Sequence, residues 1–306
     1  MWELTVVRLF QALAAALILS IQAGAASAQD KPRIVAVNYP LQYLAQRLLG
    51  DDAEVEFPVP GGVDPSFWRP SISDISAVQS ADLILLNGAG FASWIDRVSL
   101  PRSRVVNTSR AIEGQFIATE SITHSHGDGG EHSHEGLASY TWLDPTLAGA
   151  QAEAIAAAIA TRNLADPNEV YAKLAELLSD LEKLDADAQA ALAAAQNVPL
   201  IATHPRYQYL AARYGLSMTS LEWEASAAPG ADELAELQAL MATTGSRVLI
   251  WEASPSSEGL EATAQLGLEN VVFEPMAHPV TGGSFLEAFA AAVDALSDAV
   301  AATPGN

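Results

Sequence analysis

Short continuous apolar runs alternate with helical segments along most of this chain. Runs rich in β-branched residues form two series, Arg33 to Asn38, Glu54 to Val59, Asp82 to Leu86 and Arg104 to Asn107, and then Pro199 to Thr203, Leu216 to Leu221, Arg247 to Trp251 and Asn270 to Phe273. Helical segments begin between them near Pro40, Ser71, Phe91, Pro205, Ala231, Ser257 and Ser284. Such runs are typical of strands buried on both faces. The pattern predicts an α/β fold of two lobes, each a mostly parallel sheet flanked by helices.

Two further helices are predicted between the series. Asp144-Pro145 and Asp166-Pro167 each place an N-cap carboxylate before a proline at the first helical position. Leucines at helical spacing follow Asp166, and no helix breaker occurs before Asn197. A helix of about thirty residues is about 45 Å long. It could lie along the surface of one domain, but its place between the two strand series favours a rigid connector that joins both lobes.

The N-terminus has the three regions of a secretory signal peptide, namely Arg8, an apolar run from Leu9 to Ile21, and Ala26-Ser27-Ala28, although Glu3 weakens the positive end. The run is shorter than the roughly 20 residues that span a bilayer. We therefore expect a cleavable signal peptide over residues 1–28 and export to the periplasm. The predicted parts that follow are a lobe over 29–143, connecting helices over 144–197 and a lobe over 198–306, forming a monomer without a membrane span.

Composition removes several classes of function. The 306 residues include 37 acidic and 15 basic ones, for a formal net charge of −22, and no cysteine. Nucleic-acid binding needs a basic surface, so DNA and RNA are excluded as partners. Without cysteine there is no disulfide, no thiolate metal site and no lipidated N-terminal cysteine. Any bound metal ion must therefore have nitrogen and oxygen ligands.

Ligands of open α/β sheets bind outside the carboxyl ends of the strands. His204, Glu252 and Glu274 follow three predicted strands of the second series directly. An imidazole and carboxylates at strand ends form a candidate metal site. Each residue also has a structural interpretation, since His204 could be a hydrogen-bonded histidine and Glu252 could pair with an arginine or cap a helix.

Four of the six histidines gather in one segment, namely His124, His126, His132 and His134. The surrounding residues 120–139 are rich in glycine, serine and histidine without periodicity, which predicts a long loop. Loops of this length in compact proteins are mostly functional or disordered. Two His-x-His pairs favour an accessory metal-binding loop, and a polar linker is the alternative.

Several motifs occur in one order, RIVAVNYPLQYLAQRLLG, GGVDPSFWRP, NGAGFASWID, YTWLDP, LIATHPRYQYLAARYGL and VLIWEASPSSEGLEATAQ. The motifs and their order resemble those of the zinc and manganese substrate-binding proteins of ABC importers, the ZnuA/TroA type. The resemblance implies capture of Zn²⁺, or a related divalent ion, between two lobes and delivery to an ABC permease and its ATPase. A periplasmic zinc buffer or metallochaperone without a transporter is the alternative. No His-Glu-x-x-His motif occurs, so we expect no enzyme activity.

The resemblance implies three histidines and one carboxylate as metal ligands. This chain has Ser66 and Tyr140 where two of the histidines are expected, keeps His204, and has Glu274 as the late carboxylate. Hydroxyl and phenol groups are poor ligands unless ionised. The loop histidines could complete the site, His278 could substitute, or Tyr140 could favour a harder ion such as ferric iron. If none of these groups completes the ligand set, the cleft between the two lobes binds no metal ion. Zn²⁺ is the expected ion, with Mn²⁺ or iron as alternatives.

Overall fold

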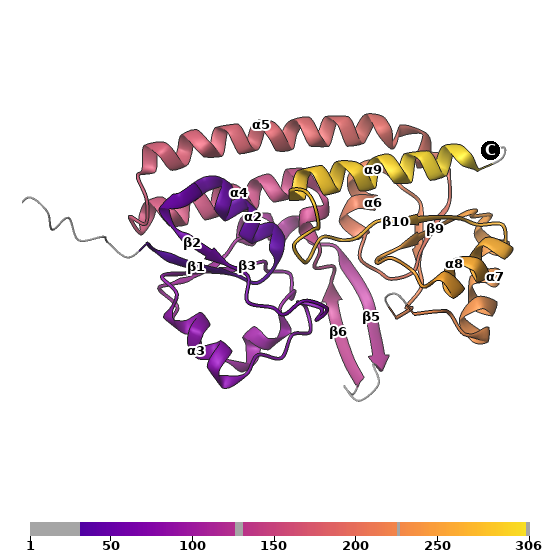
Figure 1. Ribbon diagram of the computed structural model, residues 1–306, viewed down its shortest axis with the longest axis horizontal. Helices are drawn as coiled ribbons and strands as arrows, with labels where there is room; N and C mark the ends of the chain where they lie inside the picture. Colours follow the sequence, from indigo (N-terminus) through magenta and orange to yellow (C-terminus); the bar gives the residue numbers. More distant parts are fainter. Residues whose placement is uncertain (1–30, 126–130, 225–226, 304–306) are drawn as a thin grey trace, which may run out of the picture. The chain divides into compact units, whose positions relative to one another are not determined.

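The computed structural model describes residues 31–125, 131–224 and 227–303 (Figure 1). Their strands form two parallel four-stranded sheets and one antiparallel pair. The first sheet has the order β2-β1-β3-β4, with β1 at Arg33–Ala36, β2 at Glu54–Glu56, β3 at Leu83–Leu86 and β4 at Val105–Asn107. The second has the order β10-β9-β7-β8, with β7 at Leu200–Ala202, β8 at Met218–Ser220, β9 at Val248–Trp251 and β10 at Glu269–Val272. All the strands predicted from apolar runs are confirmed, most of them shorter at one or both ends.

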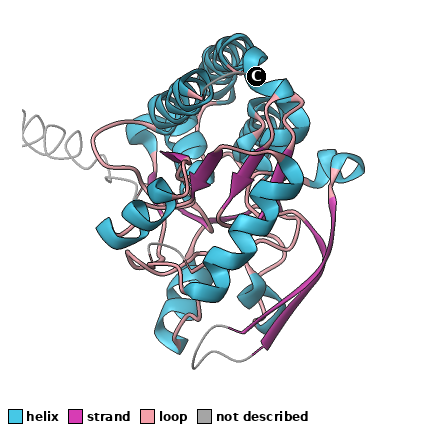
Figure 2. Cartoon of the chain, turned by 90° about the vertical axis from the view of Figure 1, so that its right-hand side faces the viewer, coloured by secondary structure: helices cyan, strands magenta, loops and turns pink. Residues whose placement is uncertain are grey.

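Helices surround the short strands of the two parallel sheets (Figure 2). They are α2 at Tyr39–Leu49, α3 at Ile72–Ser80, α6 at Gln208–Tyr214, α7 at Ala231–Thr244, α8 at Ser257–Gln265 and α9 at Phe285–Ala302. Side-chain caps begin several of them. The Asn38 side chain accepts from Leu41 N at the start of α2, and Ser71 with Asp74 forms a capping box at α3. Near Phe91 the chain forms only a 3₁₀ turn, η3 at Ser93–Arg97, in place of the predicted helix.

The two predicted connecting helices are α4 at Pro145–Thr161 and α5 at Pro167–Ala191. Helix α5 packs against α2, α4 and α9, so it contacts helices of both lobes (Figure 1). Its ion pair between Arg47 Nη2 and Asp180 Oδ2, at 2.6 Å, fastens it to α2. The helix is shorter than predicted because the chain tightens into a 3₁₀ turn, η7 at Ala193–Asn197, before the second sheet begins.

The prediction of an aperiodic loop over residues 120–139 is wrong. Strands β5 (Ala118–Ser125) and β6 (Glu131–Leu137) pair there as an antiparallel hairpin (Figures 1 and 2). A strand pair held by main-chain hydrogen bonds outside an apolar core needs no hydrophobic alternation, so its composition concealed it. His124 and His132 are register partners, whereas His126 lies outside the described residues.

One apolar core contains residues of both parallel sheets and of α5, within a compact unit from Pro32 to Asn306. Hydrogen bonds also cross between the lobes. Trp142 Nε1 donates to Pro275 O at 2.8 Å, and Tyr39 N donates to Ala277 O at 3.0 Å. Within residues 31–125, 131–224 and 227–303, no helix has the length and apolar character needed to span a bilayer. The predicted signal peptide, residues 1–28, lies outside the described residues.

Candidate functional site

Arg206 lies at the meeting point of the two lobes. It comes shortly after β7, and its side chain is only 12% exposed. Its Nη2 donates to Asp64 Oδ2 of the first lobe at 2.7 Å, and its Nε donates to Glu252 Oε2 of the second lobe at 3.0 Å. The guanidinium carbon also lies 4.8 Å from the ring centre of Tyr140. One buried cation therefore joins carboxylates that are 142 and 46 residues away in sequence.

Ser66 and Tyr140, the residues at the family's histidine positions, belong to the same cluster. Ser66 Oγ donates to Asp64 Oδ1 at 2.5 Å and lies 3.4 Å from Tyr140 Oη. The Ser66 backbone N–H also donates to Asp64 Oδ1, at 2.8 Å. Asp64 thus accepts from Ser66 with one oxygen and from Arg206 with the other. The hydroxyl of Ser66 serves a carboxylate here.

His204 occupies the end of β7, as predicted, and is 5% exposed. Its Nδ1–H donates to Trp223 O at 3.1 Å, which places the proton of the neutral ring on Nδ1. The same nitrogen lies 3.8 Å from Glu252 Oε1. His204 is therefore a neighbour of the Glu252–Arg206 pair. The pairing of Glu252 with an arginine, one of the structural interpretations, is confirmed.

The charges of this cluster follow from burial and from Arg206. Burial raises the pKa of Asp64, but Arg206 and the Ser66 hydrogen bonds outweigh it, and the pKa lies below its usual range. At Glu252 burial outweighs Arg206 and the pKa is raised. Burial raises the pKa of Tyr140 far above that of a free phenol, so its oxygen stays protonated in the metal-free protein. The pKa of Arg206 is raised because the carboxylates of Asp64 and Glu252 outweigh its burial.

Glu274 and His278 are the two remaining candidate ligands. Glu274 is exposed and lines a separate pocket of about 350 Å³ beside α9, together with Val272 and Met276. His278 Nε2–H donates to Val63 O at 2.6 Å, and its ring meets Phe57 edge-on at 5.3 Å between centroids. The structure thus gathers Ser66, Tyr140 and His204 around Asp64 and Arg206, and His278 is hydrogen-bonded to the residue directly before Asp64.

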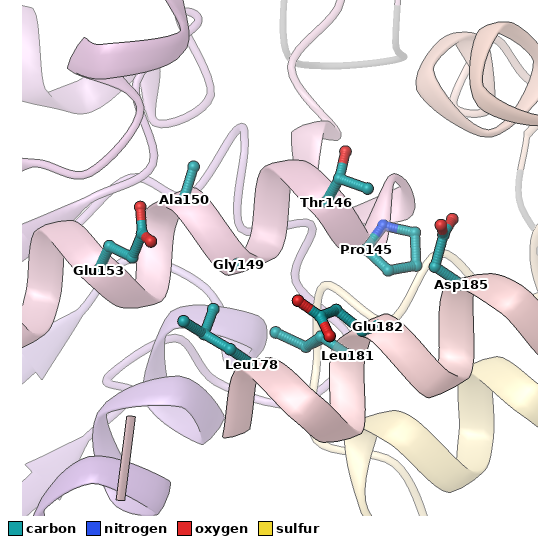
Figure 3. A pocket seen from close by; sticks show the side chains of 9 residues that line it. All are labelled: Pro145, Thr146, Gly149, Ala150, Glu153, Leu178, Leu181, Glu182 and Asp185. Carbon is teal, nitrogen blue, oxygen red and sulfur yellow. The ribbon is translucent and has the colours of Figure 1, made fainter. Parts of the chain in front are cut away.

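In the part of the chain that the structure describes, no group of three or more histidine, aspartate or glutamate side chains is arranged to hold a metal ion. The groove between α4 and α5, about 480 Å³, contains carboxylates but no imidazole (Figure 3). Of these, Asp185 accepts from Arg213 Nε at 2.8 Å. Ligation by His204, Glu274, Tyr140, Ser66 or His278 stays a prediction.

Sequence reasoning missed Arg206, Asp64 and a buried amide pair. Gln151 Nε2 donates to Asn87 Oδ1 at 3.1 Å, and Asn87 Nδ2 donates to Ser139 O at 2.9 Å, which fixes the chain directly before Tyr140. A usable signal existed for Arg206. An arginine lies two residues after His204, in a chain that has lost two ligand histidines but kept carboxylates after the strands.

Comparison with known proteins gives a consistent result. A family model described as ZnuA, Zinc-uptake complex component A periplasmic, matches residues 34–299. The High-affinity zinc uptake system protein ZnuA of Bacillus subtilis (strain 168) is 26% identical over 264 residues, which cover 84% of this chain and 82% of that protein. The Zinc-binding protein AdcA of Streptococcus pyogenes is 24% identical over 269 residues, 83% of this chain and 52% of AdcA, so the chain spans about half of AdcA.

Solved structures agree on the fold. The metal-dependent lipoprotein YcdH of Bacillus subtilis has a TM-score of 0.73 at 22% identity, covering 88% of this chain and 98% of that one. The Zn(II)-bound ZnuA-like domain of Streptococcus pneumoniae AdcA has a TM-score of 0.73 at 19% identity, covering 88% and 99%. Because the family match runs through both sheets and the helices that join them, the chain belongs to the ZnuA family of periplasmic zinc-uptake components, which are metal-binding substrate-binding proteins and not enzymes.

Proposed function

We propose that this protein is exported to the periplasm, captures Zn²⁺ or a related divalent ion, and delivers it to an ABC importer made of a permease and an ATPase. The family match over residues 34–299 carries this proposal. The relatives whose names include zinc uptake or zinc binding support zinc as the cargo. Capture and release make and break no covalent bond, so this role needs no catalytic group.

We assign capture to the histidines of the β5–β6 hairpin. Backbone pairing makes His124 and His132 register partners, and His134 follows two residues after His132 in the same strand. Neutral imidazoles are the commonest nitrogen ligands of Zn²⁺, and these three histidines belong to one short hairpin. Imidazole ligands favour Zn²⁺ over Mn²⁺ or ferric iron.

The base of the hairpin connects it to the Arg206 cluster. Tyr209 Oη donates to Ala138 O at 3.1 Å and accepts from Ile117 N at 3.3 Å, so α6 of the second lobe holds both ends of the hairpin. Tyr140, under the Arg206 guanidinium, follows Ala138 by two residues. A metal ion on the hairpin would thus be bound close in sequence to the junction of the lobes.

Native mass spectrometry with zinc titration of the mature chain tests the capture step. We expect tight zinc in the wild type and its loss when His124, His126, His132 and His134 are all changed to Asn. Changing the alternate positions Thr123, Ser125 and Ser133 to Asn is the matched control and should leave binding intact. Unchanged stoichiometry and affinity in the four-histidine variant would contradict hairpin capture. Affinity should also fall as pH drops through about 6.5, because bound imidazoles must be neutral.

Delivery is tested separately from capture. Zinc-loaded protein should stimulate ATP hydrolysis by its permease and ATPase in proteoliposomes, whereas the four-histidine variant should not. Zinc binding without any stimulation would favour the alternative role, a periplasmic zinc buffer or metallochaperone that is not coupled to a transporter.

A further inference from the structure

We propose that Arg206 replaces the metal ion as the cation that joins the two lobes, so that the position between Asp64, Tyr140, His204 and Glu252 binds no divalent ion in this protein. The inference concerns a different part of the molecule from the hairpin. It makes Arg206 the residue that decides what occupies the interlobe position, and it predicts lobes that are held together without cargo.

The geometry supports this assignment. Arg206 N donates to His204 O at 2.9 Å, a tight turn that places the arginine beside the strand end where a ligand histidine is expected. Its guanidinium contacts Asp64 of one lobe at 2.7 Å and Glu252 of the other at 3.0 Å. The ring face of Tyr140, 4.8 Å from the guanidinium carbon, adds a cation–π contact on a third side. One cation therefore contacts both lobes at once, as a bound metal would.

The charges of Asp64 and Glu252 also favour Arg206 over a divalent ion at this position. A divalent ion between Asp64 and Glu252 would be held by carboxylates that already accept hydrogen bonds from Arg206. Removing one partner from a buried ion pair leaves an uncompensated charge, which strongly opposes displacement of the guanidinium. The substitutions around it are compatible with a fixed arginine, because Ser66 Oγ donates to Asp64 and Tyr140 offers its ring. A neutral imidazole in place of Ser66 or Tyr140 would add no negative charge to pair with Arg206.

An ordinary stabilising ion pair predicts something different. In that case Arg206 would contribute stability, while zinc could still bind at His204 beside it. The proposal instead makes zinc affinity independent of His204 and makes closure of the lobes depend on Arg206. Both quantities can be measured on the mature chain with the hairpin intact.

In the first arm, zinc titration compares the wild type with His204→Ala. We expect equal stoichiometry and affinity. A tenfold or larger loss of affinity in His204→Ala would overturn the proposal, because zinc would then be bound at the interlobe position. This outcome is distinct from failure of hairpin capture, which is read from the four-histidine variant. No change at Arg206 is required, so the arm stands even if arginine variants fold poorly.

In the second arm, hydrogen exchange compares Arg206→Met with Arg213→Met, in the absence of metal. Arg213 is also ion-paired, with Asp185 of α5 and, at 3.9 Å, with Asp144, which places it away from the Asp64–Glu252 cluster in its charge contacts. We expect amide exchange in residues 138–143 to be about tenfold faster in Arg206→Met, since local opening sets exchange rates, and unchanged in Arg213→Met. Equal amide exchange rates in both variants would overturn the proposal that Arg206 holds the lobes together. Arg206→Lys should give an intermediate rate, because a lysine keeps the charge without the planar fork.

Discussion

The phenol of Tyr140 contributes its ring to the cluster. The side chain is buried and its pKa is strongly raised by that burial. Tyr140→Phe keeps the ring under Arg206 and removes only the 3.4 Å contact with Ser66 Oγ. We expect unchanged zinc affinity and a loss of unfolding free energy of about 1 kcal/mol or less. Competition with a fluorescent chelator measures the zinc affinity, and urea unfolding measures the unfolding free energy. A marked fall in affinity would identify a phenolate ligand.

Asp64 should make the stability of the protein depend on pH. Its pKa is lower in the folded state than the unfolded value of about 3.9, so its contribution is complete above that value and is lost as pH falls through the folded pKa. Asp64→Asn should lower the unfolding free energy by about 2 kcal/mol at pH 7, the loss of hydrogen bonds to a charged group. The difference from wild type should shrink below about pH 4.

Urea unfolding between pH 2.5 and 8 measures this difference, with Asp298→Asn on the exposed face of α9 as the control. Glu252 acts in the opposite sense, since its raised pKa makes the folded protein hold its proton more tightly than the unfolded chain. Its contribution is therefore largest below about pH 4.3 and declines as pH rises towards the folded pKa. A pH-independent effect of Asp64→Asn would show that its ion pair with Arg206 is energetically unimportant.

For single residues, the sequence predicted which side chains gather in the cluster better than it predicted their hydrogen-bond and ion-pair partners. The resemblance identified Ser66, Tyr140 and His204, and the structure brings all of them together around Arg206. The partner of Asp64 was missed because it lies 142 residues along the chain, in the other lobe. Pairing over such a distance depends on how the lobes dock, and no local pattern encodes that.

Elements that form around the apolar core were predictable and the hairpin was not. Strands such as Leu83–Leu86 are buried on both faces, so burial marks them in the sequence as continuous apolar runs. Helix α5 was recognised from its N-cap and leucine spacing, but its end was placed too far along because alanine and glutamine fit a helix and a 3₁₀ turn equally well. Strands β5 and β6 lack such an apolar signal in the sequence, and the structure identifies them by their backbone pairing.

The hairpin depends on one tyrosine at its base. Tyr209 is 2% exposed, and its hydroxyl contacts both Ile117 and Ala138. Tyr209→Phe removes both contacts and leaves a buried carbonyl unpaired, which should cost about 1–3 kcal/mol of unfolding free energy. Exchange of the Ile117 and Ala138 amides should become faster. Tyr171→Phe, at an exposed position on α5, is the matched control and should have no effect. An unchanged exchange rate in Tyr209→Phe would mean that other contacts hold the hairpin.

Across the whole molecule, the lobes are joined by more than Arg206. The apolar core is continuous through both parallel sheets and α5, and Trp142 donates to Pro275 O across the junction. These contacts limit how far the lobes can separate. At its base the hairpin is joined to the second lobe through Tyr209, which is hydrogen-bonded to both Ile117 and Ala138.

A shared core should make both lobes unfold together. Calorimetry of the metal-free mature chain should give one transition with calorimetric and van't Hoff enthalpies that agree, as expected for a single cooperative unit. Trp142→Phe removes the 2.8 Å hydrogen bond to Pro275 O and part of a fully buried ring. It should lower Tm by about 3–4 °C, given a loss of about 2 kcal/mol in a chain of this size. The single transition should persist in this variant. Two resolved transitions in the wild type would show that each lobe folds on its own and that the junction contributes little.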